Sequence, residues 1–289
     1  MDDATAAELA RRVWTRAEAY HAITYFSPEC LAAYVDAGLK GFWRGYFAGR
    51  SAPFGAIGAG PIAASFHGFR PDFVDRALPS IWELITPEAA IEARLTGADA
   101  TLRRIMDVES SKAELAEAAS LLREAFEGAD VSGRPIYAAN AALAWPTEPH
   151  LAVWHGATLL REHRGDGHVA ALTAAGLDGA EANVLRLAVA DLPLDVMASV
   201  RGWDEDDWTA ARARLVEREL VDDTGATAAG TALYADIETT TDRLATGPIR
   251  RIGEQAAARL VELLDPWADA IGAAGDLPYP NPIGVPRPN

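Results

Sequence analysis

Apolar residues recur at helical spacing along most of the chain, and they predict a protein built almost entirely of α-helices. In the first predicted helix, Leu9, Val13 and Ala17 lie four residues apart, and the pattern continues to about Tyr25. Alternating Val, Ile and Thr runs, which are typical of strands, are nearly absent. Further helices are expected at 29–37, 72–76, 87–95, 98–106, 110–127, 133–145, 148–164, 169–175, 180–189, 195–201, 204–220, 228–244 and 254–271.

The segment 41–69 has a different pattern, with many glycines between apolar and aromatic residues. Trp43, Tyr46, Phe47 and Arg50 fall at positions i, i+3, i+4 and i+7, which places them on one helical stripe. Glycine lets backbones approach closely. We therefore expect short helices here that pack on each other or on a bound molecule.

The segment 192–230 has the order of elements of a winged helix. A short helix at 195–201 ends at Gly202, Asp204 caps a longer helix, and 221–225 provides a short wing. In the longer helix, Trp208 and Leu215 are expected to face inward. The arrangement predicts a helix-turn-helix followed by a very short β-hairpin.

The charge of this segment is wrong for DNA binding. The second helix should read bases near its amino end, but here that end is Asp204-Glu205-Asp206-Asp207. Residues 166–289 contain ten Arg against twenty-one Asp and Glu, and the whole chain has a net charge of −16. Carboxylates repel phosphates, so the sequence predicts a structural winged helix, used for packing or dimerisation, with nucleic acid an unlikely partner.

The remaining bulk features predict a cytoplasmic protein. The single cysteine, Cys30, excludes an internal disulfide and a cysteine-based zinc cluster. The acidic start Met1-Asp2-Asp3 does not resemble a signal peptide, and no apolar run is long enough to cross a bilayer. No membrane partner is expected.

Candidate catalytic residues are concentrated in the segment 154–168. His155 and Glu162 are seven residues apart and would project from one helical face. Imidazole and carboxylate groups are used for acid–base catalysis and for metal ligation. The candidates are His155, Glu162, His163, Asp166 and His168.

A purely structural alternative exists for the same segment. Gly165 would end one helix, Asp166 would cap the next, and Arg161 and Glu162 would form ordinary ion pairs. Because no diagnostic metal or nucleophile motif is present, the metal and any other cofactor are left open.

Rings and guanidinium groups of the N-terminal part suggest a ligand pocket. His21 and Tyr25 lie one helical turn apart. A pocket with aromatic walls and arginine side chains suits an anionic or aromatic small molecule. The candidate ligand-binding residues are His21, Tyr25, Trp43, Arg44, Tyr46, Arg50, His67 and Trp154. The alternative is a core of aromatic residues with arginines that bind helix carboxyl ends.

Three longer motifs resemble a known family. They are His21-Ala22-Ile23-Thr24-Tyr25-Phe26, Gly41-Phe42-Trp43-Arg44-Gly45-Tyr46-Phe47-Ala48-Gly49-Arg50 and Leu160-Arg161-Glu162-His163-Arg164-Gly165-Asp166-Gly167-His168. Together with Arg201-Gly202-Trp203, they resemble the SalK-like helix-turn-helix proteins of actinobacteria, some of which lie near secondary-metabolite gene clusters. The resemblance implies the fold and no particular activity.

These observations predict a mainly α fold, in which a multi-helix N-terminal domain packs on a C-terminal MarR-like winged-helix domain. The expected boundaries are 1–165, 166–275 and an extended Pro-rich tail at 276–289, with a core shared by the two domains. The expected function is binding of a small molecule, and the protein could also be an enzyme of specialised metabolism. In such an enzyme a histidine assisted by Glu162 or Asp166 would move protons, while Arg44 or Arg50 would hold an anionic group.

Two other classes of function remain open. One is a ligand-responsive MarR-like transcription regulator that binds a palindrome as a homodimer. The other is a non-catalytic subunit that binds a protein partner through the Pro-rich tail.

Overall fold

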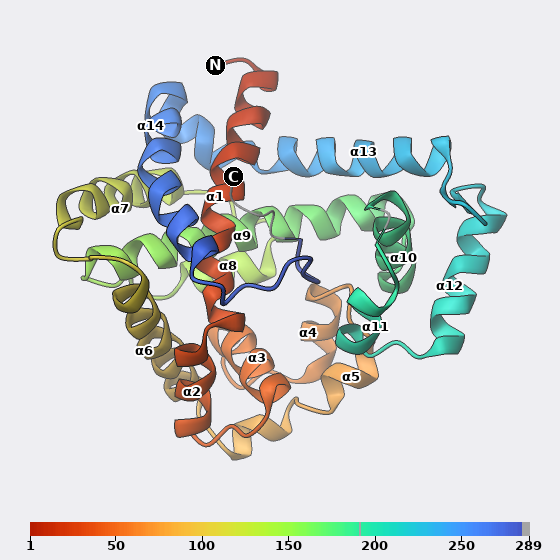
Figure 1. The fold of residues 1–289 in the computed structure, drawn as a ribbon, viewed down its shortest axis with the longest axis horizontal. Helices are drawn as coiled ribbons and strands as arrows, with labels where there is room; N and C mark the ends of the chain where they lie inside the picture. Colours follow the sequence, from red (N-terminus) through yellow and green to blue (C-terminus); the bar gives the residue numbers. More distant parts are fainter. Residues whose placement is uncertain (191, 285–289) are drawn as a thin grey trace.

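The computed structural model describes residues 1–190 and 192–284 and is mainly helical, as the sequence predicts (Figure 1). The N-terminal part contains α1 (Asp3–Phe26), α2 (Pro28–Asp36), α3 (Phe42–Ser51), η1 (Ala52–Phe54), α4 (Ala59–Ser65), α5 (Pro71–Asp75), η2 (Ser80–Glu83), α6 (Pro87–Ile105), α7 (Lys112–Phe126), α8 (Pro135–Ala141) and α9 (Pro149–Ala174). The rest contains α10 (Gly179–Ala190), α11 (Asp195–Arg201), α12 (Glu205–Glu217), β1 (Val221–Asp222), β2 (Gly225–Ala226), α13 (Ala228–Leu244) and α14 (Thr246–Ala273). Within the described residues, no helix combines the length and apolar character needed to cross a bilayer.

Helix α9 runs through the middle of the molecule and packs against α1, α7, α8 and α13 (Figure 1). It begins with Pro149, at a position where proline removes no helical hydrogen bond. Most of its surface is buried, so its many polar side chains need partners inside the protein. The predicted catalytic segment lies on this helix.

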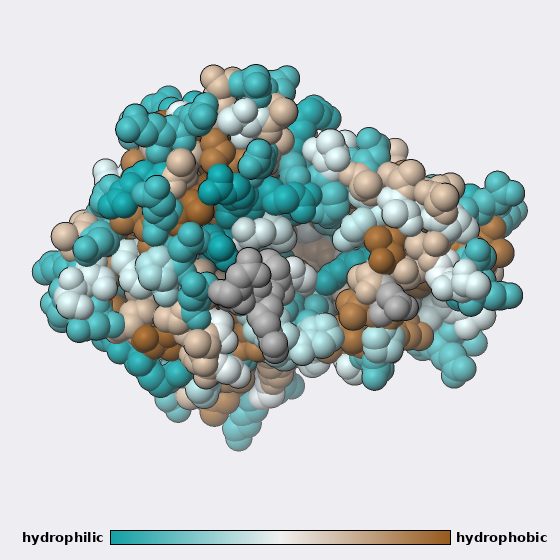
Figure 2. Space-filling view, turned by 45° about the horizontal axis from the view of Figure 1, so that its top comes forward, coloured by the Kyte–Doolittle hydropathy of each residue, from teal (hydrophilic) through white to brown (hydrophobic). Residues whose placement is uncertain are grey.

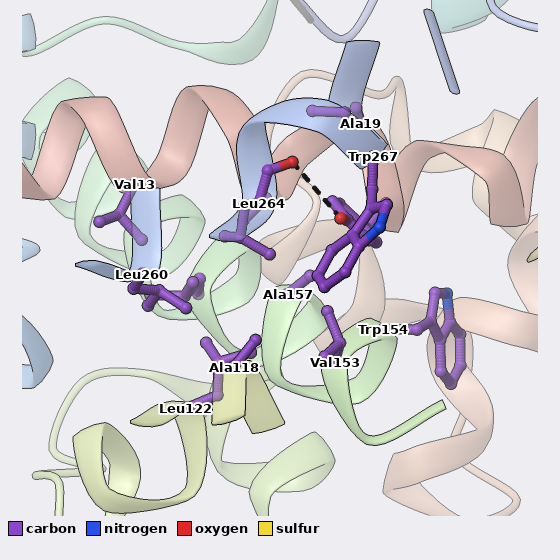
Figure 3. Close-up of a cluster of buried hydrophobic side chains, with 14 of the residues drawn as sticks. Val13, Ala19, Ala118, Leu122, Val153, Trp154, Ala157, Leu260, Leu264 and Trp267 are labelled. Carbon is purple, nitrogen blue, oxygen red and sulfur yellow. Dashed lines mark hydrogen bonds between the residues drawn. The ribbon is translucent and has the colours of Figure 1, made fainter. Parts of the chain in front are cut away.

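The main hydrophobic core is formed where α1, α7, α9 and α14 meet (Figure 3). Small side chains such as Ala118 and Ala157 let the helices approach, and Leu264 and Trp267 of α14 fill the space between them. At the same place the Tyr20 hydroxyl donates a hydrogen bond to the Leu264 carbonyl at 3.4 Å. This core fixes α1 and α14 against the central helix.

The glycine-rich segment 41–69 forms the predicted short helices, α3, η1 and α4, around a second core of aromatic rings. The Trp43 and Phe73 ring centroids are 4.9 Å apart, and those of Phe47 and Phe69 are 5.4 Å apart. These edge contacts are a favourable packing of aromatic rings. The second core lies beside α11 (Figure 1).

The helix break expected at Gly165 is wrong, because α9 continues through Gly165 and Gly167 to Ala174. Each glycine costs an isolated helix about 1 kcal/mol, but here neighbouring elements compensate. A Cβ at Gly167 would lie 3.2 Å from the Leu244 Cβ, so this glycine allows the end of α13 to approach α9. The expected boundary at 165/166 lies inside α9. The helix expected at 133–145 is shorter, at Pro135–Ala141.

Helices α10, α11 and α12 and the β1–β2 hairpin follow in the predicted order. Gly202 ends α11 in the left-handed conformation (φ 79°), and Asp204 and Asp207 form a capping box at the start of α12. Met197 and Trp208 hold the helices together in a small core. The hairpin is antiparallel, with Val221 opposite Ala226. The long helix α13 leads from it back to α14 (Figure 1).

Candidate ligand-binding cavity

A cavity of about 520 Å³ lies between the N-terminal helices and the helix-turn-helix region. Figure 2 shows a hollow in the surface between the larger part of the molecule, on the left, and the smaller part, on the right. A narrower chamber of about 180 Å³ continues from it and shares part of its wall. The side chains and glycine common to both chambers are Arg50, Arg161, Gly165, His168, Arg186, Arg201 and Tyr234.

The cavity wall is unusually rich in arginine for an acidic protein. Six arginines line the larger chamber: Arg11, Arg50, Arg161, Arg164, Arg186 and Arg201. Four of them form ion pairs with nearby carboxylates, which belong to Glu18, Glu162, Glu238 and Asp242. The positive charge of the cavity therefore exceeds its negative charge by two.

The excess charge belongs to Arg186 of α10 and Arg201 of α11. In the described chain, no carboxylate lies within ion-pair distance of either guanidinium. Both donate hydrogen bonds to the Pro282 carbonyl, from Arg186 Nη1 at 3.0 Å and from Arg201 Nη2 at 2.5 Å. Burial lowers the pKa of Arg186, and it lowers that of Arg201 to about 10, at which Arg201 remains charged at neutral pH.

Behind this wall, Glu162 is buried between two arginines. Both of its carboxylate oxygens accept hydrogen bonds from Arg50 Nη2 at 3.2 Å, and Arg161 Nη1 donates a further one. Burial raises the pKa of Glu162, but the positive charges of Arg161 and Arg50 outweigh burial and bring this pKa to about 2. Glu162 is therefore ionised at neutral pH and holds both guanidinium groups in place.

His21 belongs to the same buried network. The Thr158 hydroxyl donates to the Trp154 carbonyl at 3.1 Å, so it accepts from His21 Nδ1, which is also 3.1 Å away. His21 Nε2 then accepts from the Tyr25 hydroxyl at 2.5 Å. Burial lowers the pKa of His21 well below its usual value, and this histidine is neutral.

Arg50 connects this network to the cavity. Its Nη1 donates to the Tyr46 hydroxyl at 3.1 Å, and its guanidinium lies 4.0 Å from the centre of the Phe66 ring. Its Nε is buried without a hydrogen-bond acceptor in the described residues. A buried donor without an acceptor is energetically costly.

His168 and His67 are the predicted histidines that reach the cavity. The Thr241 hydroxyl donates to the Ile237 carbonyl, so it accepts from His168 Nδ1 at 3.0 Å, which leaves His168 Nε2 as an acceptor. Burial lowers the pKa of His168 to about 4. His67 lines the narrower chamber, and its buried Nδ1 has no partner in the described chain.

Thus the structure brings together seven of the thirteen predicted site residues. Tyr46, Arg50, His67 and His168 line the cavity, and His21, Tyr25 and Glu162 form the network behind it.

Two predicted histidines and one aspartate of α9 lie elsewhere. His155 packs edge-on against Trp145, and His163 packs against Tyr137; burial lowers the pKa of each histidine to about 3. Asp166 accepts a hydrogen bond from the Tyr137 backbone at 2.9 Å and thereby caps the first turn of α8. None of the three lines the cavity.

Three other predicted residues also lie outside it. Trp154 is in the core and donates from Nε1 to the Thr24 hydroxyl at 3.2 Å. Trp43 belongs to the aromatic cluster, and Arg44 is exposed.

Most of the cavity arginines were missed by sequence reasoning, together with the aromatic and acidic residues beside them. The missed residues are Arg11, Trp14, Glu18, Arg161, Arg164, Arg186, Arg201, Tyr234 and Glu238. One signal was present in the sequence: Arg161, Arg164 and His168 lie at i, i+3 and i+7, on one side of the predicted helix.

The turn of the helix-turn-helix is docked onto the N-terminal part of the chain. Arg70 Nη1 donates to Asp204 at 2.6 Å and lies 3.1 Å from Asp207, and the Arg70 backbone donates to the Arg201 carbonyl at 2.9 Å. Trp203 Nε1 donates to the Gly68 carbonyl at 2.9 Å. The amino end of α12 is therefore engaged by this chain itself.

The arginines of α12 and of the residue after it are also engaged. Arg212 donates to the Asp222 carbonyl, Arg214 pairs with Asp178 at 2.5 Å, and Arg218 donates to the Gly176 carbonyl at 2.9 Å. These contacts hold the three guanidinium groups against β1 and the residues between α9 and α10.

No group of three or more His, Cys, Asp or Glu side chains in residues 1–190 and 192–284 is arranged to hold a metal ion. Comparison with curated proteins and with solved structures finds no match. A helix-turn-helix family does match, over residues 10–278. With nearly the whole chain covered, this protein belongs to that helix-turn-helix family.

Proposed function

We propose that this protein binds a small anionic molecule in the cavity, and that its helix-turn-helix region forms a wall of that cavity instead of binding DNA. The observation that carries the proposal is the placement of Arg186 and Arg201. They come from α10, which precedes the helix-turn-helix, and from α11, its first helix; both line the cavity and have no carboxylate partner in the described chain. Guanidinium groups in such a place attract an anion.

The size and the other walls of the cavity support a small organic ligand. Its volume of about 520 Å³ is in the usual range for small-molecule sites. Trp14, Tyr46 and Tyr234 add aromatic surface to the arginines. The protein as a whole is acidic, so the cavity concentrates positive charge in one sheltered place.

Catalysis in the same cavity is a second candidate. His168 is neutral with a free Nε2 acceptor and lines the cavity. A neutral histidine beside an anion-binding wall suits proton transfer. An enzyme of specialised metabolism would use these groups, and its test is product formation that is lost in a His168→Gln variant.

The alternative is a ligand-responsive, MarR-like regulator, and membership of a helix-turn-helix family fits both functions. The acidic amino end of α12 and its contacts with Arg70 argue against DNA binding. A gel-shift assay at low salt with the protein's own upstream region separates the two functions. We expect no competitor-resistant complex; a tight one, formed by a homodimer in sedimentation experiments, would overturn the proposal.

A glycine substitution offers a direct test of ligand binding. The atoms nearest to a Cβ at Gly165 would be Arg161 Nη1 at 3.7 Å and Glu162 Oε2 at 3.8 Å, which are ordinary contacts; because Gly165 lines the cavity, a larger side chain there extends into it. Gly165→Leu should therefore fold and block the site. Gly60→Leu, on the open surface of α4, is the matched control.

The measurement is thermal unfolding in the presence of a panel of phosphorylated, carboxylated and neutral metabolites. A ligand at 100 times its Kd stabilises the folded state by about 2.7 kcal/mol. We expect an anionic compound to stabilise the wild type and the Gly60→Leu variant but not the Gly165→Leu variant. Equal stabilisation of all three proteins would contradict the proposal.

A further inference from the structure

The Arg186 and Arg201 guanidinium groups converge on a single oxygen atom. Arg186 Nη1 is 3.0 Å and Arg201 Nη2 is 2.5 Å from the Pro282 carbonyl oxygen, although the three residues are far apart in the sequence. A neutral carbonyl offers these two cations only a partial negative charge. We propose, on the basis of the proposed function, that Arg186 and Arg201 bind the phosphate group of a phosphate monoester, and that the Pro282 carbonyl occupies this position until the ligand displaces it.

The charge of the cavity selects a ligand with two negative charges. The other four arginines of the cavity share four carboxylates, whereas Arg186 and Arg201 have none within ion-pair distance in the described residues. A phosphate monoester carries a charge of about −1.5 to −2 at pH 7. It would neutralise the excess, whereas a monocarboxylate would neutralise half of it.

The geometry selects a compact head group. Because both guanidiniums reach one point, they suit an anion whose charge is concentrated on one centre. The two carboxylates of a dicarboxylate are on separate carbon atoms and cannot both occupy that point. Phosphate oxygens also match the fork of an arginine side chain.

Two arginines of the wall shared by the chambers each have a further donor without an acceptor among the described residues. Arg201 Nε and Arg50 Nε are both buried without an acceptor in the described chain, and both residues line the two chambers. The organic part of the ligand would extend along Trp14 and Tyr234 in the larger chamber.

The C-terminal segment covers this position in the structure. Pro282, Ile283 and Gly284 line the larger chamber, and the segment is held by Leu277 (3% exposed), by the buried Asn281 and by Ile283, which packs against both cores. Movement of residues 281–284 would free both guanidinium groups at the cost of the Asn281 and Ile283 contacts, and would leave Leu277 in the core. The ligand and this segment therefore compete for the same hydrogen-bond donors.

The test is isothermal titration calorimetry of the full chain with phenyl phosphate, benzoate and phthalate. We expect phenyl phosphate to bind at one site, at least tenfold more tightly than the other two. Arg186→Gln and Arg201→Gln should each weaken it at least tenfold, and a chain that ends at Pro280 should bind it more tightly. Arg250→Gln is the control, because Arg250 is on the surface and contacts Asp3.

The outcomes separate this inference from the proposed function. If benzoate or phthalate binds as tightly as phenyl phosphate, and the binding is lost in Gly165→Leu, the phosphate subsite is wrong and the cavity remains a ligand site. If no anion binds, or if Gly165→Leu does not weaken its binding, both the phosphate subsite and the proposed function are wrong. Arg186→Lys and Arg201→Lys keep the positive charge but lack the fork of the guanidinium group. Weak binding of phenyl phosphate by these variants, with unchanged circular dichroism, supports recognition by that fork. Binding as tight as in the wild type contradicts it.

Discussion

Arg70 of the loop before α5 donates a 2.6 Å hydrogen bond to Asp204, the residue that caps the amino end of α12. In a DNA-binding helix-turn-helix this end of the second helix reaches into the major groove. Here it points a carboxylate at the protein's own arginine. The Arg70 backbone also donates a 2.9 Å hydrogen bond to the Arg201 carbonyl, so the same residue holds the end of α11, and with it Arg201 of the cavity wall.

The docking of the turn can be measured at Gly202. Its φ is +79°, and a Cβ would lie 2.3 Å from the Phe73 Cβ. Gly202→Ala should therefore destabilise the protein by about 2–4 kcal/mol, from backbone strain and overpacking together. Urea unfolding gives the value.

Gly275 provides the matched control for this substitution. Its φ is +81°, but nothing lies within 4 Å of an added Cβ. Gly275→Ala should cost only the backbone strain, about 1 kcal/mol. Equal costs at the two positions would mean that the turn does not pack on Phe73.

The buried carboxylate of Glu162 should be essential for the folded state. It is 2% exposed and pairs with Arg50 at 3.2 Å. Glu162→Gln leaves Arg50 buried without its counter-ion and leaves Arg161 with Glu18 alone, so we expect a loss of about 3–5 kcal/mol in the free energy of unfolding.

A surface pair is the control for Glu162. Glu117 lies 2.8 Å from Arg259 and is exposed, so Glu117→Gln should change the urea midpoint little. A loss for Glu162→Gln no larger than that for Glu117→Gln would contradict the buried network.

Buried histidines should make the protein sensitive to acid. The pKa values of His155 and His163 are lowered to about 3, below the usual 6.5. Between these two values the unfolded chain binds a proton that the folded chain does not. Their contribution to stability is therefore fully present above pH 6.5 and is lost as the pH falls toward 3.

The slope of stability against pH measures this effect. Each such histidine contributes about 1.4 kcal/mol per pH unit in that window, so His155→Leu or His163→Leu should lower the slope by about this amount. Tyr137→Phe, beside His163, should leave the slope as in the wild type. An unchanged slope in both histidine variants would show that these side chains titrate normally in the folded state.

Asp166 should change the pH dependence of stability in the opposite direction. Burial raises its pKa from 3.8 to about 7, so the folded chain retains a proton that the unfolded chain has lost. Its contribution is present below pH 3.8 and is lost as the pH rises through 7. Asp166→Asn keeps an acceptor for the Tyr137 backbone and removes the charge.

We therefore expect the stability gained by Asp166→Asn, relative to the wild type, to be greater at pH 8 than at pH 5, as measured by urea unfolding at both values. A smaller gain at pH 8 would show that Asp166 is not buried in its neutral form.

Sequence reasoning predicted the helical class and the helix-turn-helix order, because both depend on local spacing and capping residues such as Asp204. It also identified Tyr46 and Arg50, whose helical stripe is local. It failed at Gly165, because the packing that stabilises α9 there comes from distant segments.

The central part of the site could not be predicted in this way. Arg186 and Arg201 meet only because α10 and α11 turn toward each other and the segment at Pro282 returns to them. His155 and His163 have the residue type of a catalytic pair, but His155 packs on Trp145 of the loop before α9, and His163 faces α7 and α8.

Native mass spectrometry of the protein after incubation with a cell metabolite extract shows whether the cavity is the functional site. We expect one negatively charged small molecule bound to each wild-type and Gly60→Leu chain, and none bound to Gly165→Leu. A wild-type protein that retains no small molecule, or a Gly165→Leu variant that retains the same one, would contradict the cavity as the functional site.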